Sequence, residues 1–296
     1  MEQSGPARGH GGAVHTRAGP SRTAEGVAAF RAAESMLPED ERICCDPYAI
    51  HFVSPAKRAR VAEYSTTRFP GLENTIVARV RYFDDTIRAA AGCGLEQLVI
   101  MGAGYDTRAY RIDELKGHVR VFEIDHPDTQ QVKKEKIREI FGRLPDHVVY
   151  VPVDFETQEF GRRLPECGYS PAKKTLFVME GLIMYLPLPA IDAMLFFIVQ
   201  NSGRGSAILF DCSATTRHNA PSPDGTRKNL GEHTAQGGEP IRFAMPEEGA
   251  EAFLEKRGFT RVRTVTSDEY RQMYFHGKNK DRELYRSLSF TYAVVR

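Results

Sequence analysis

Short apolar runs alternate with segments of helical spacing through the middle of the chain. The runs cover residues 98–101, 120–124, 147–151, 175–179 and 206–210. Strands of this length that alternate with helices predict a parallel, doubly wound sheet. Two later runs, Phe259 to Thr266 and Ser289 to Val295, show no full helix between them and predict an antiparallel pair that closes the sheet. We therefore expect an α/β fold with seven strands, five of them parallel.

The residues ahead of the sheet have mostly helical patterns. Apolar positions recur at helical spacing from Ser21 until Pro38 ends the pattern, at Val27, Phe30, Ala33 and Leu37. Asp46 and Pro47 indicate the start of another helix. Glu73 to Ala91 predicts a longer helix whose apolar face contains Ile76, Val80, Phe83 and Ile87. We expect residues 22–94 to form a helical cap ahead of a core at 95–296.

A glycine turn follows the first run, and acidic residues end the second. At Gly102-Ala103-Gly104 the missing side chains let a ligand approach the backbone closely. Glu123 and Asp125 follow about 20 residues later, where a carboxylate can accept hydrogen bonds from ribose hydroxyls. The two acids share strand parity, so we expect one of them to serve the structure, and we favour Asp125 for the ligand. The pattern predicts a site for an adenosine-containing cofactor.

The type of cofactor follows from a missing glycine. A dinucleotide fingerprint has a third glycine that permits tight helix packing beside a pyrophosphate, but Thr107 occupies that place here, followed by Arg108. A nucleoside without phosphates needs only the open turn and the acid, which favours S-adenosylmethionine. The alternative is a glycine turn that is only structural, since such turns are common after strands.

A glycine follows the first of the five runs, and a carboxylate follows each of the other four. The residues are Gly102, Asp125, Asp154 with Phe155, Glu180 with Gly181, and Asp211. Because ligands bind at the carboxyl ends of parallel strands, these residues predict one site assembled from several loops, although polar strand ends are also ordinary helix caps. We expect His126, which precedes Pro127, to cap a helix and not to act in catalysis.

Composition narrows the class of protein. Forty basic and 39 acidic residues give a net charge of +1, which offers no electrostatic attraction for nucleic acid or an anionic membrane. No apolar run is long enough to span a bilayer. Five cysteines without metal-binding spacing indicate free thiols in a reducing cytoplasm. We expect a soluble cytoplasmic protein without a metal, in which residues 1–21 form a disordered leader and residues 22–296 a single domain.

Seven motifs occur in order along the chain: TAEGVAAFRAAES at 23–35, VARVRYFDD at 77–85, MGAGYDTRAYRI at 101–112, FEIDHPDTQQVK at 122–133, VPVDF at 151–155, MEGLIMYLP at 179–187 and GEPIRFAMPEE at 238–248. In this combination they resemble the leucine carboxyl methyltransferase-like family of class I S-adenosylmethionine-dependent O-methyltransferases. The resemblance spans residues 22–296. Two departures are Tyr105, where the family often has Leu or Met, and Phe155, where Leu is frequent.

The resemblance implies a Rossmann-like methyltransferase sheet and a role for each matching residue. Gly102 and Gly104 would let the cofactor approach the backbone, and Asp125 would hold its ribose hydroxyls. Asp154 would accept from the adenine amino group, while Phe155 packs on the ring. For the zwitterionic methionine portion, Arg79 would pair with the carboxylate, with Arg22 as a weaker candidate, and Glu180 would face the amino group. Without the resemblance, an arginine such as Arg79 on a helix is usually solvated.

The methyl acceptor depends on residues outside these motifs. The family suggests a carboxylate of a small metabolite or a peptide C-terminus, which is already ionised at neutral pH, whereas a hydroxyl acceptor of specialised metabolism would need a base. A segment at about 212–246 is long enough to form a lid together with residues 54–72 (Tyr64, Arg68, Phe69). In it, Arg217 could hold an acceptor carboxylate and His218 could act as a base, or both could be solvated. Tyr185 could contact the donor or could be a core residue.

Two further readings come from other classes of protein. A nicotinamide-dependent oxidoreductase is disfavoured by the missing third glycine and by the lack of a Tyr-x-x-x-Lys pair in a matching place. A protein with this fold could also bind a nucleotide without catalysis, as a partner or regulator. The pattern leaves the oligomeric state open.

Overall fold

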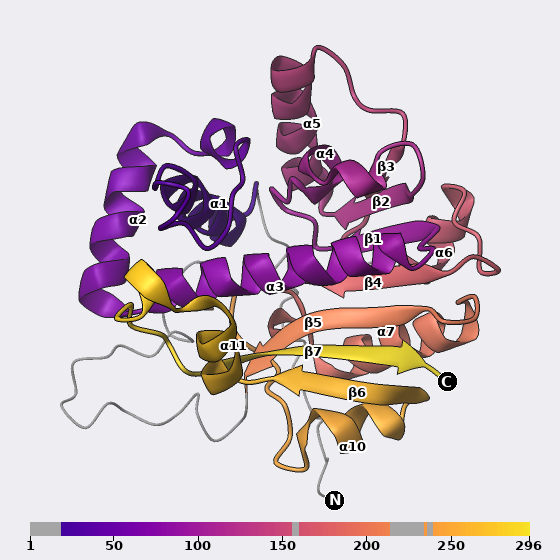
Figure 1. The fold of residues 1–296 in the computed structure, drawn as a ribbon. Helices are drawn as coiled ribbons and strands as arrows, with labels where there is room; N and C mark the ends of the chain where they lie inside the picture. The colour runs from indigo at the N-terminus through magenta and orange to yellow at the C-terminus, as the bar shows by residue number, and fades with distance from the viewer. Residues whose placement is uncertain (1–18, 156–159, 214–233, 236–238) are drawn as a thin grey trace, which may run out of the picture.

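The sheet contains seven strands in the order β3-β2-β1-β4-β5-β7-β6 (Figure 1). The computed structural model describes residues 19–155, 160–213, 234–235 and 239–296, apart from the side chains of residues 62–68. The strands are β1 Gln97–Met101, β2 Arg120–Asp125, β3 Val148–Pro152, β4 Thr175–Met179, β5 Ala207–Ser213, β6 Phe259–Val265 and β7 Leu288–Val295. The first five run parallel, and β7 is antiparallel to both of its neighbours. The predicted α/β sheet is therefore confirmed.

Helices cover both faces of this sheet. They are α1 Arg22–Ser35, α2 Pro55–Arg68, α3 Leu72–Gly92, α4 Arg108–Arg111, α5 Pro127–Phe141, α6 Phe160–Glu166, α7 Leu188–Gln200, α10 Gly249–Glu255 and α11 Ser267–Tyr274. Short 3-10 turns are η1 Ala49–Phe52, η2 Asp113–Leu115, η3 Ile183–Tyr185 and η4 Gly277–Asn279. In Figure 1, α3 lies across one face of the sheet, while α6 and α7 lie behind it.

The apolar residues of the strands divide between two cores. Leu98 and Ile100 of β1 join the core under α1, α3 and α11, whereas Val99 and Met101 join the core under α6, α7 and α10. Alternate side chains of a strand point to opposite faces, so a strand that is apolar throughout must be covered on both sides. The loops that follow the carboxyl ends of the parallel strands lie outside these two cores.

Two of the three helices expected ahead of the sheet form as predicted. Helix α1 ends shortly before Pro38, and α3 buries its predicted face, with Phe83 and Ile87 fully buried. The helix start expected at Asp46 is wrong, because the chain forms only the 3-10 turn η1 there. The Asp46 carboxylate caps this turn by accepting from the backbone N–H groups of Tyr48 and Ala49, each at 3.2 Å.

The expectation that no full helix separates the last two strands is also wrong. Helix α11 lies between β6 and β7 and is eight residues long. It begins with a capping box, in which the Thr266 side chain and the Glu269 side chain each bond the other residue's backbone N–H. Tyr270 of this helix is fully buried and stacks on Phe290 of β7. The helix therefore packs over the antiparallel pair that the pattern predicted.

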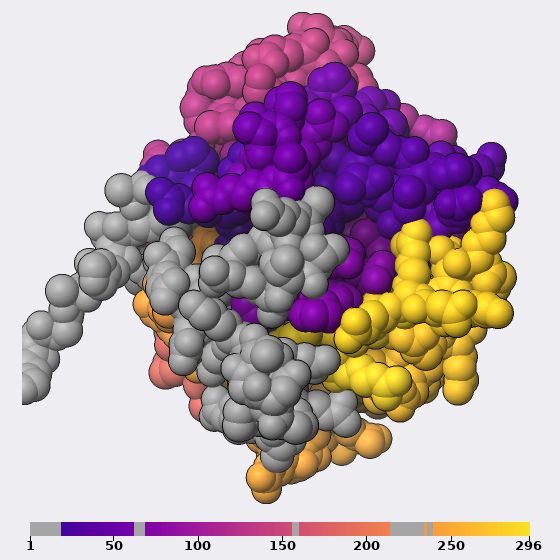
Figure 2. All heavy atoms as spheres, turned by 90° about the vertical axis from the view of Figure 1, so that its left-hand side faces the viewer, coloured from indigo at the N-terminus to yellow at the C-terminus, as the bar shows by residue number. Residues whose placement is uncertain are grey.

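The start of α3 is joined to the C-terminal residues. The Tyr285 N–H donates to the Gly71 carbonyl at 3.1 Å and to the Thr75 hydroxyl at 2.9 Å, and Asn74 donates to the Glu283 carbonyl at 2.8 Å. Figure 2 shows the N-terminal helices, from indigo to purple, beside the yellow C-terminal residues on one face of the molecule. These bonds hold α3 and the last strand in one arrangement.

Replacement of Gly71 by alanine is expected to destabilise this junction. Gly71 has a φ of +79°, and an added Cβ would lie 2.7 Å from backbone atoms of Glu283 and Leu284. We expect a loss of about 3 kcal/mol or more in the free energy of unfolding, from backbone strain together with the steric overlap. Urea denaturation would measure it.

Gly117→Ala is the matched control. Gly117 has a φ of +77° and nothing within 4 Å of an added Cβ, so this variant carries only the backbone strain of about 1–2 kcal/mol. Equal losses in the two variants would mean that the contact with residues 283–284 does not constrain α3.

Candidate functional site

The glycine turn lies at the carboxyl end of β1, between the sheet and the first helix. Gly102 and Gly104 have φ angles of +64° and +43°, which residues with a side chain rarely adopt. A Cβ on Gly102 would lie 3.0 Å from Leu182, and one on Gly104 would lie 3.1 Å from Ala24 of α1. The turn therefore needs glycine both for its backbone conformation and for its close neighbours.

The two acids of β2 have different partners. Asp125 is 8% exposed at the end of the strand, where Oδ2 accepts from the Gly104 N–H at 2.5 Å and Oδ1 accepts from the His126 N–H at 2.6 Å. Glu123 is buried deeper and forms an ion pair with Lys133 at 2.8 Å. Glu123 therefore has a partner within the fold, and Asp125 lies at the strand end. The His126 side chain accepts from the Asp128 N–H, which confirms its predicted role as a helix cap.

Arg79 extends from α3 to the ends of β4 and β5. Its Nε donates to Glu180 at 3.1 Å and its Nη1 donates to Asp211 at 2.7 Å, and all three side chains are nearly inaccessible. The Gly181 N–H donates to the other oxygen of Asp211 at 2.6 Å. Burial alone would lower the pKa of Arg79, but Asp211 and Glu180 outweigh it and raise that pKa. The arginine is therefore a fixed buried cation.

Arg108 holds the other side of Glu180. Its Nη1 lies 2.5 Å from Glu180 Oε2 and 2.5 Å from Asp106, and its Nε donates to Asp84 at 2.7 Å. Glu180 is thus bracketed by Arg79 and Arg108. Burial would raise the pKa of Asp106, yet the positive charges of Arg108 and Lys133 hold it well below its usual range. The pKa of Asp84 is also lowered. Asp106 of the turn and Asp84 of α3 are therefore both held ionised beside Arg108.

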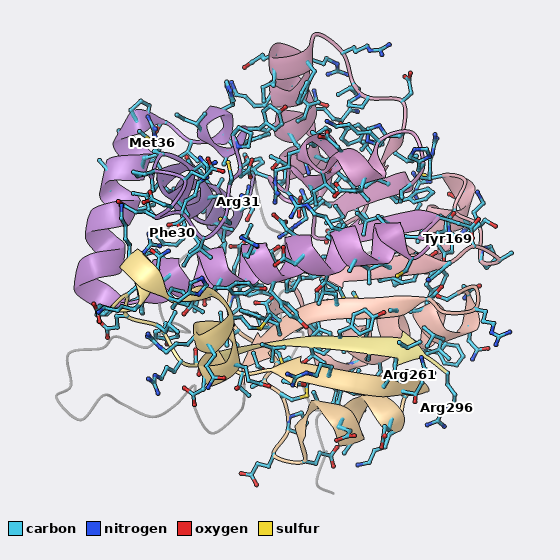
Figure 3. All side chains as sticks on the ribbon, in the orientation of Figure 1. Phe30, Arg31, Met36, Tyr169, Arg261 and Arg296 are labelled. Atoms are coloured by element: carbon cyan, nitrogen blue, oxygen red, sulfur yellow. The ribbon has the colours of Figure 1, made fainter. Side chains whose placement is uncertain are left out.

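The pairing continues from Asp84 toward α1. Arg111 forms a two-pronged pair with Asp84 at 2.5 and 2.7 Å, and its Nε is 4.0 Å from Asp46. Asp46 also pairs with Arg31 of α1 at 2.8 Å, and Arg31 donates to the Tyr105 carbonyl next to the glycine turn. Figure 3 shows Arg31 between α1 and the helices over the sheet. We call these nine charged residues the arginine–carboxylate network: Arg31, Asp46, Arg79, Asp84, Asp106, Arg108, Arg111, Glu180 and Asp211.

The remaining predicted residues lie after β3, in η3 and at the start of α1. Asp154 and Phe155 follow β3 and are half-buried, and the Phe155 ring lies 6.4 Å from that of Phe160. Tyr185 is in η3, where burial raises the pKa of its hydroxyl despite the lowering by Arg79. Arg22 is exposed at the first position of α1.

Part of the expected lid cannot be placed. Arg217 and His218 lie outside the described residues, as do most of residues 212–246 and the side chains of Tyr64 and Arg68. Phe69 is buried with its ring 6.5 Å from that of Tyr285, so it serves the junction of α3 with the C-terminal residues.

Sequence reasoning missed most of the network. One signal for Asp84 was present, because it lies between Phe83 and Ile87 on the buried part of α3, where a charged residue needs a partner. Arg108 and Arg111 follow the glycine turn at the spacing of one helical turn, which places them together on α4. None of these signals identified the partners, which come from distant segments.

No metal site accompanies this edge in the part of the chain that the structure describes. No group of three or more His, Cys, Asp or Glu side chains is arranged there to hold an ion. The described helices also include none with the length and apolar character needed to cross a membrane.

Comparison with known families identifies the class of protein to which this chain belongs. The family model described as leucine carboxyl methyltransferase matches residues 24–199. The chain belongs to the leucine carboxyl methyltransferase family. The match includes the glycine turn, both acids of β2, Arg79 and Glu180.

Similar proteins are named as methyltransferases, and a solved structure has the same fold. A Bacillus subtilis (strain 168) protein named "Putative S-adenosyl-L-methionine-dependent methyltransferase YktD" is 28% identical over 75% of this chain and 73% of its own length. A Mycolicibacterium smegmatis protein with the same description is 32% identical over 75% of each chain. The crystal structure of a putative methyltransferase from Thermobifida fusca YX has the same fold, with a TM-score of 0.63 at 14% identity and coverage of 94% and 96%.

This member of the leucine carboxyl methyltransferase family is therefore an S-adenosylmethionine-dependent methyltransferase. The alternatives of a nicotinamide-dependent oxidoreductase and a non-catalytic binding protein are set aside by this membership. The residues at the carboxyl ends of the strands fit such a cofactor: a turn of two glycines without side chains, Gly102 and Gly104, and a carboxylate at Asp125. The bonds from Arg79 to Glu180 and Asp211 use Nε and Nη1, and a Cβ added on Gly181 would lie 3.6 Å from the remaining nitrogen, Nη2.

Breaking the arginine–carboxylate network should be costly. We expect Arg108→Met to lower the free energy of unfolding by about 3–5 kcal/mol, because Asp84, Asp106 and Glu180 would remain buried without their shared cation. Urea denaturation at neutral pH would measure the change.

Arg88→Met provides the control for this variant. Arg88 is 40% exposed on the same helix as Asp84, with carboxylates at 3.8 and 3.9 Å, and its loss should change the stability by no more than about 1 kcal/mol. A loss with Arg108→Met as small as that of the control would show that the network does not hold the fold.

Proposed function

We propose that the chain methylates a carboxylate, forming a methyl ester on a small metabolite or a peptide C-terminus. The acceptor oxygen forms a bond to the methyl carbon as the bond from that carbon to the sulfonium sulfur breaks, which leaves S-adenosylhomocysteine. The donor is strongly activated, so the protein needs to position the two reactants and exclude water. The family model supports a carboxyl acceptor through its description.

The choice of a carboxylate acceptor rests on the hydrogen bonds and protonation of the titratable groups described at the carboxyl ends of the strands. His126 uses Nδ1 to accept from the Asp128 N–H, and Asp211 is held between Arg79 and Gly181. Burial keeps the Tyr185 hydroxyl protonated by raising its pKa, and Glu239 accepts from the hydroxyls of Ser21 and Thr23. None of these groups is poised to take a proton from a hydroxyl acceptor, whereas a carboxylate needs no base.

We assign the cofactor contacts to the residues that meet at the carboxyl ends of the strands. Gly102 and Gly104 would admit the cofactor to the backbone, and Asp125 would accept from its ribose hydroxyls. Asp154 and Phe155, after β3, would hold the adenine amino group and ring.

The methionine portion would lie near the paired charges of Arg79 and Glu180. Nη2 of Arg79 would donate to the carboxylate, and Glu180 would attract the ammonium group from a position fixed by two arginines. Arg22 is a second candidate for the carboxylate. The network holds one more carboxylate than guanidinium, which favours a cofactor of net positive charge.

Asp125→Asn is expected to weaken cofactor binding. Loss of the charged acceptor should raise the Kd for S-adenosylhomocysteine by about 10- to 100-fold, as for hydrogen bonds to a charged group. Isothermal titration calorimetry would measure this Kd. Asp113→Asn, whose carboxylate is 86% exposed on η2, should bind like the wild type. If Asp125→Asn also bound like the wild type, the ribose assignment would be wrong.

The product should carry the new methyl group as an ester. Incubation of the enzyme and methyl-labelled S-adenosylmethionine with extracts of producer cells should give a product that gains one methyl group by mass spectrometry and releases methanol in hydroxide. At saturating cofactor, kcat should be independent of pH from about 6 to 8, since a carboxylate is ionised throughout. A hydroxide-stable product, with a rate that rises with pH, would instead identify a hydroxyl acceptor.

A further inference from the structure

A second group of buried polar side chains comes from α5, β2, α4 and β3, next to the glycine turn. Lys133 of α5 and Glu123 of β2 are each 1% exposed and pair at 2.8 Å. The Tyr110 hydroxyl donates to Glu123 at 3.1 Å and lies 2.9 Å from the Tyr150 hydroxyl. One oxygen of Glu123, Oε1, has no hydrogen-bond partner. The reaction described above uses none of these groups. Because burial of charged groups is unfavourable, we expect this pair to serve a role in the protein.

Lys133 also reaches the turn itself. Its Nζ lies 3.5 Å from the Ala103 carbonyl oxygen, and its charge contributes to the lowered pKa of Asp106. A single buried ammonium group therefore joins α5 and β2 to the segment that follows β1. Ala103 N–H is bonded to the Ile124 carbonyl at 2.9 Å, which fixes the other side of the same residue.

The position of the Ala103 carbonyl determines the position of the next amide. The Ala103 carbonyl and the Gly104 N–H belong to one planar peptide unit and point in opposite directions. Lys133 contacts the oxygen end of this unit, while the N–H end donates to Asp125 at 2.5 Å. A tilt of the peptide would move the Gly104 N–H and with it the carboxylate that it holds.

We propose that Lys133, itself held by Glu123, is a positioning residue that orients the Ala103–Gly104 peptide and the Asp125 carboxylate for the cofactor. This inference rests on the proposed contact between Asp125 and the ribose. Lys133 does not touch the cofactor, and it acts through a peptide unit that does. Its loss should change the affinity for cofactor more than the rate of methyl transfer.

The pair also makes cofactor affinity depend on pH near neutrality. Burial raises the pKa of Glu123 to about 7, although Lys133 lowers it. The other groups that face Glu123 are Asp106 from the turn, Tyr110 from α4 and Tyr150 from β3, and burial raises the pKa of both tyrosines so that they stay neutral. Below about pH 7, Glu123 gains a proton and the ion pair with Lys133 is lost. Cofactor affinity should therefore fall as the pH decreases through 7.

Lys133→Met tests the positioning role directly. We expect the Kd for S-adenosylhomocysteine and the KM for S-adenosylmethionine to rise on the order of 10-fold, with kcat at saturating cofactor changed less than twofold, since small displacements at a binding site are costly. Lys136→Met removes an exposed lysine of the same helix and should leave both constants unchanged. A folded Lys133→Met enzyme with wild-type Kd and KM would overturn the proposal.

The wild-type enzyme tests the inference even if Lys133→Met does not fold. Calorimetry with S-adenosylhomocysteine between pH 6 and 8 should show weaker binding below about pH 7. In Glu123→Gln the affinity should be independent of pH and close to the low-pH value of the wild type. His126→Asn, which keeps the helix cap, should retain the pH dependence. A wild-type affinity that is independent of pH, or a dependence that disappears with His126→Asn, would exclude the role of Glu123.

These outcomes can be separated from a failure of the proposed cofactor contact. If wild-type binding does not depend on Asp125, the ribose assignment fails and the positioning role fails with it. If Asp125→Asn weakens binding and Lys133→Met does not, only the positioning role is excluded.

Discussion

The arrangement of the site depends on buried ion pairs between arginines and carboxylates. Charges are costly to remove from water, and pairs such as Arg79–Asp211 and Arg108–Glu180 are tolerated only with close geometry and further hydrogen bonds. The network links α1, the residue that caps η1, α3, the glycine turn, α4 and the ends of β4 and β5. Because removal of one member would leave several buried charges without partners, each segment is held in one position relative to the others. The ion pairs therefore fix the carboxyl ends of β4 and β5 relative to α1 and α3.

Carboxylates at the carboxyl ends of the strands differ in their partners. Glu123 and Asp125 are two residues apart on one face of β2, yet Glu123 pairs with a buried lysine and Asp125 contacts backbone N–H groups at the strand end. Glu180 is fixed by two arginines, while Asp211 is fixed by one arginine and a glycine amide. Burial and the nature of the partner, and not residue type, determine which carboxylate remains available to a ligand.

The fold was largely predictable because its signals are local. Apolar runs and their spacing predicted all seven strands, and the resemblance led to a family that comparison confirms. The two errors concern short elements. At Asp46 the side chain caps a 3-10 turn in place of a helix, and the capping box at Thr266 begins a helix that we did not expect. In both cases one or two hydrogen bonds from a polar side chain determine the result, and hydrophobic spacing does not reveal them.

The site was less predictable because its contacts are long-range. Arg79 and Asp211 are 132 positions apart, and Arg31 reaches a carbonyl 74 positions away. On a helix considered alone, Arg79 would be expected to be solvated, and only the resemblance assigned it to the cofactor. Arg108 was noted as the residue after a missing glycine, while its burial among three carboxylates follows from the packing of α3, the turn and β4. Sequence spacing carries no information on such packing.

A crystal structure of the complex with S-adenosylhomocysteine is the most direct test of the central claim, that the network presents Arg79 and Glu180 to the cofactor at the glycine turn. The account predicts that the ribose hydroxyls bond to Asp125 and the carboxylate to Nη2 of Arg79. It also predicts that Arg79 keeps its pairs with Glu180 and Asp211, and that Arg108 keeps its pair with Glu180. A ligand bound away from this edge, or an Arg79 side chain that leaves Asp211 and Glu180 on binding, would contradict it.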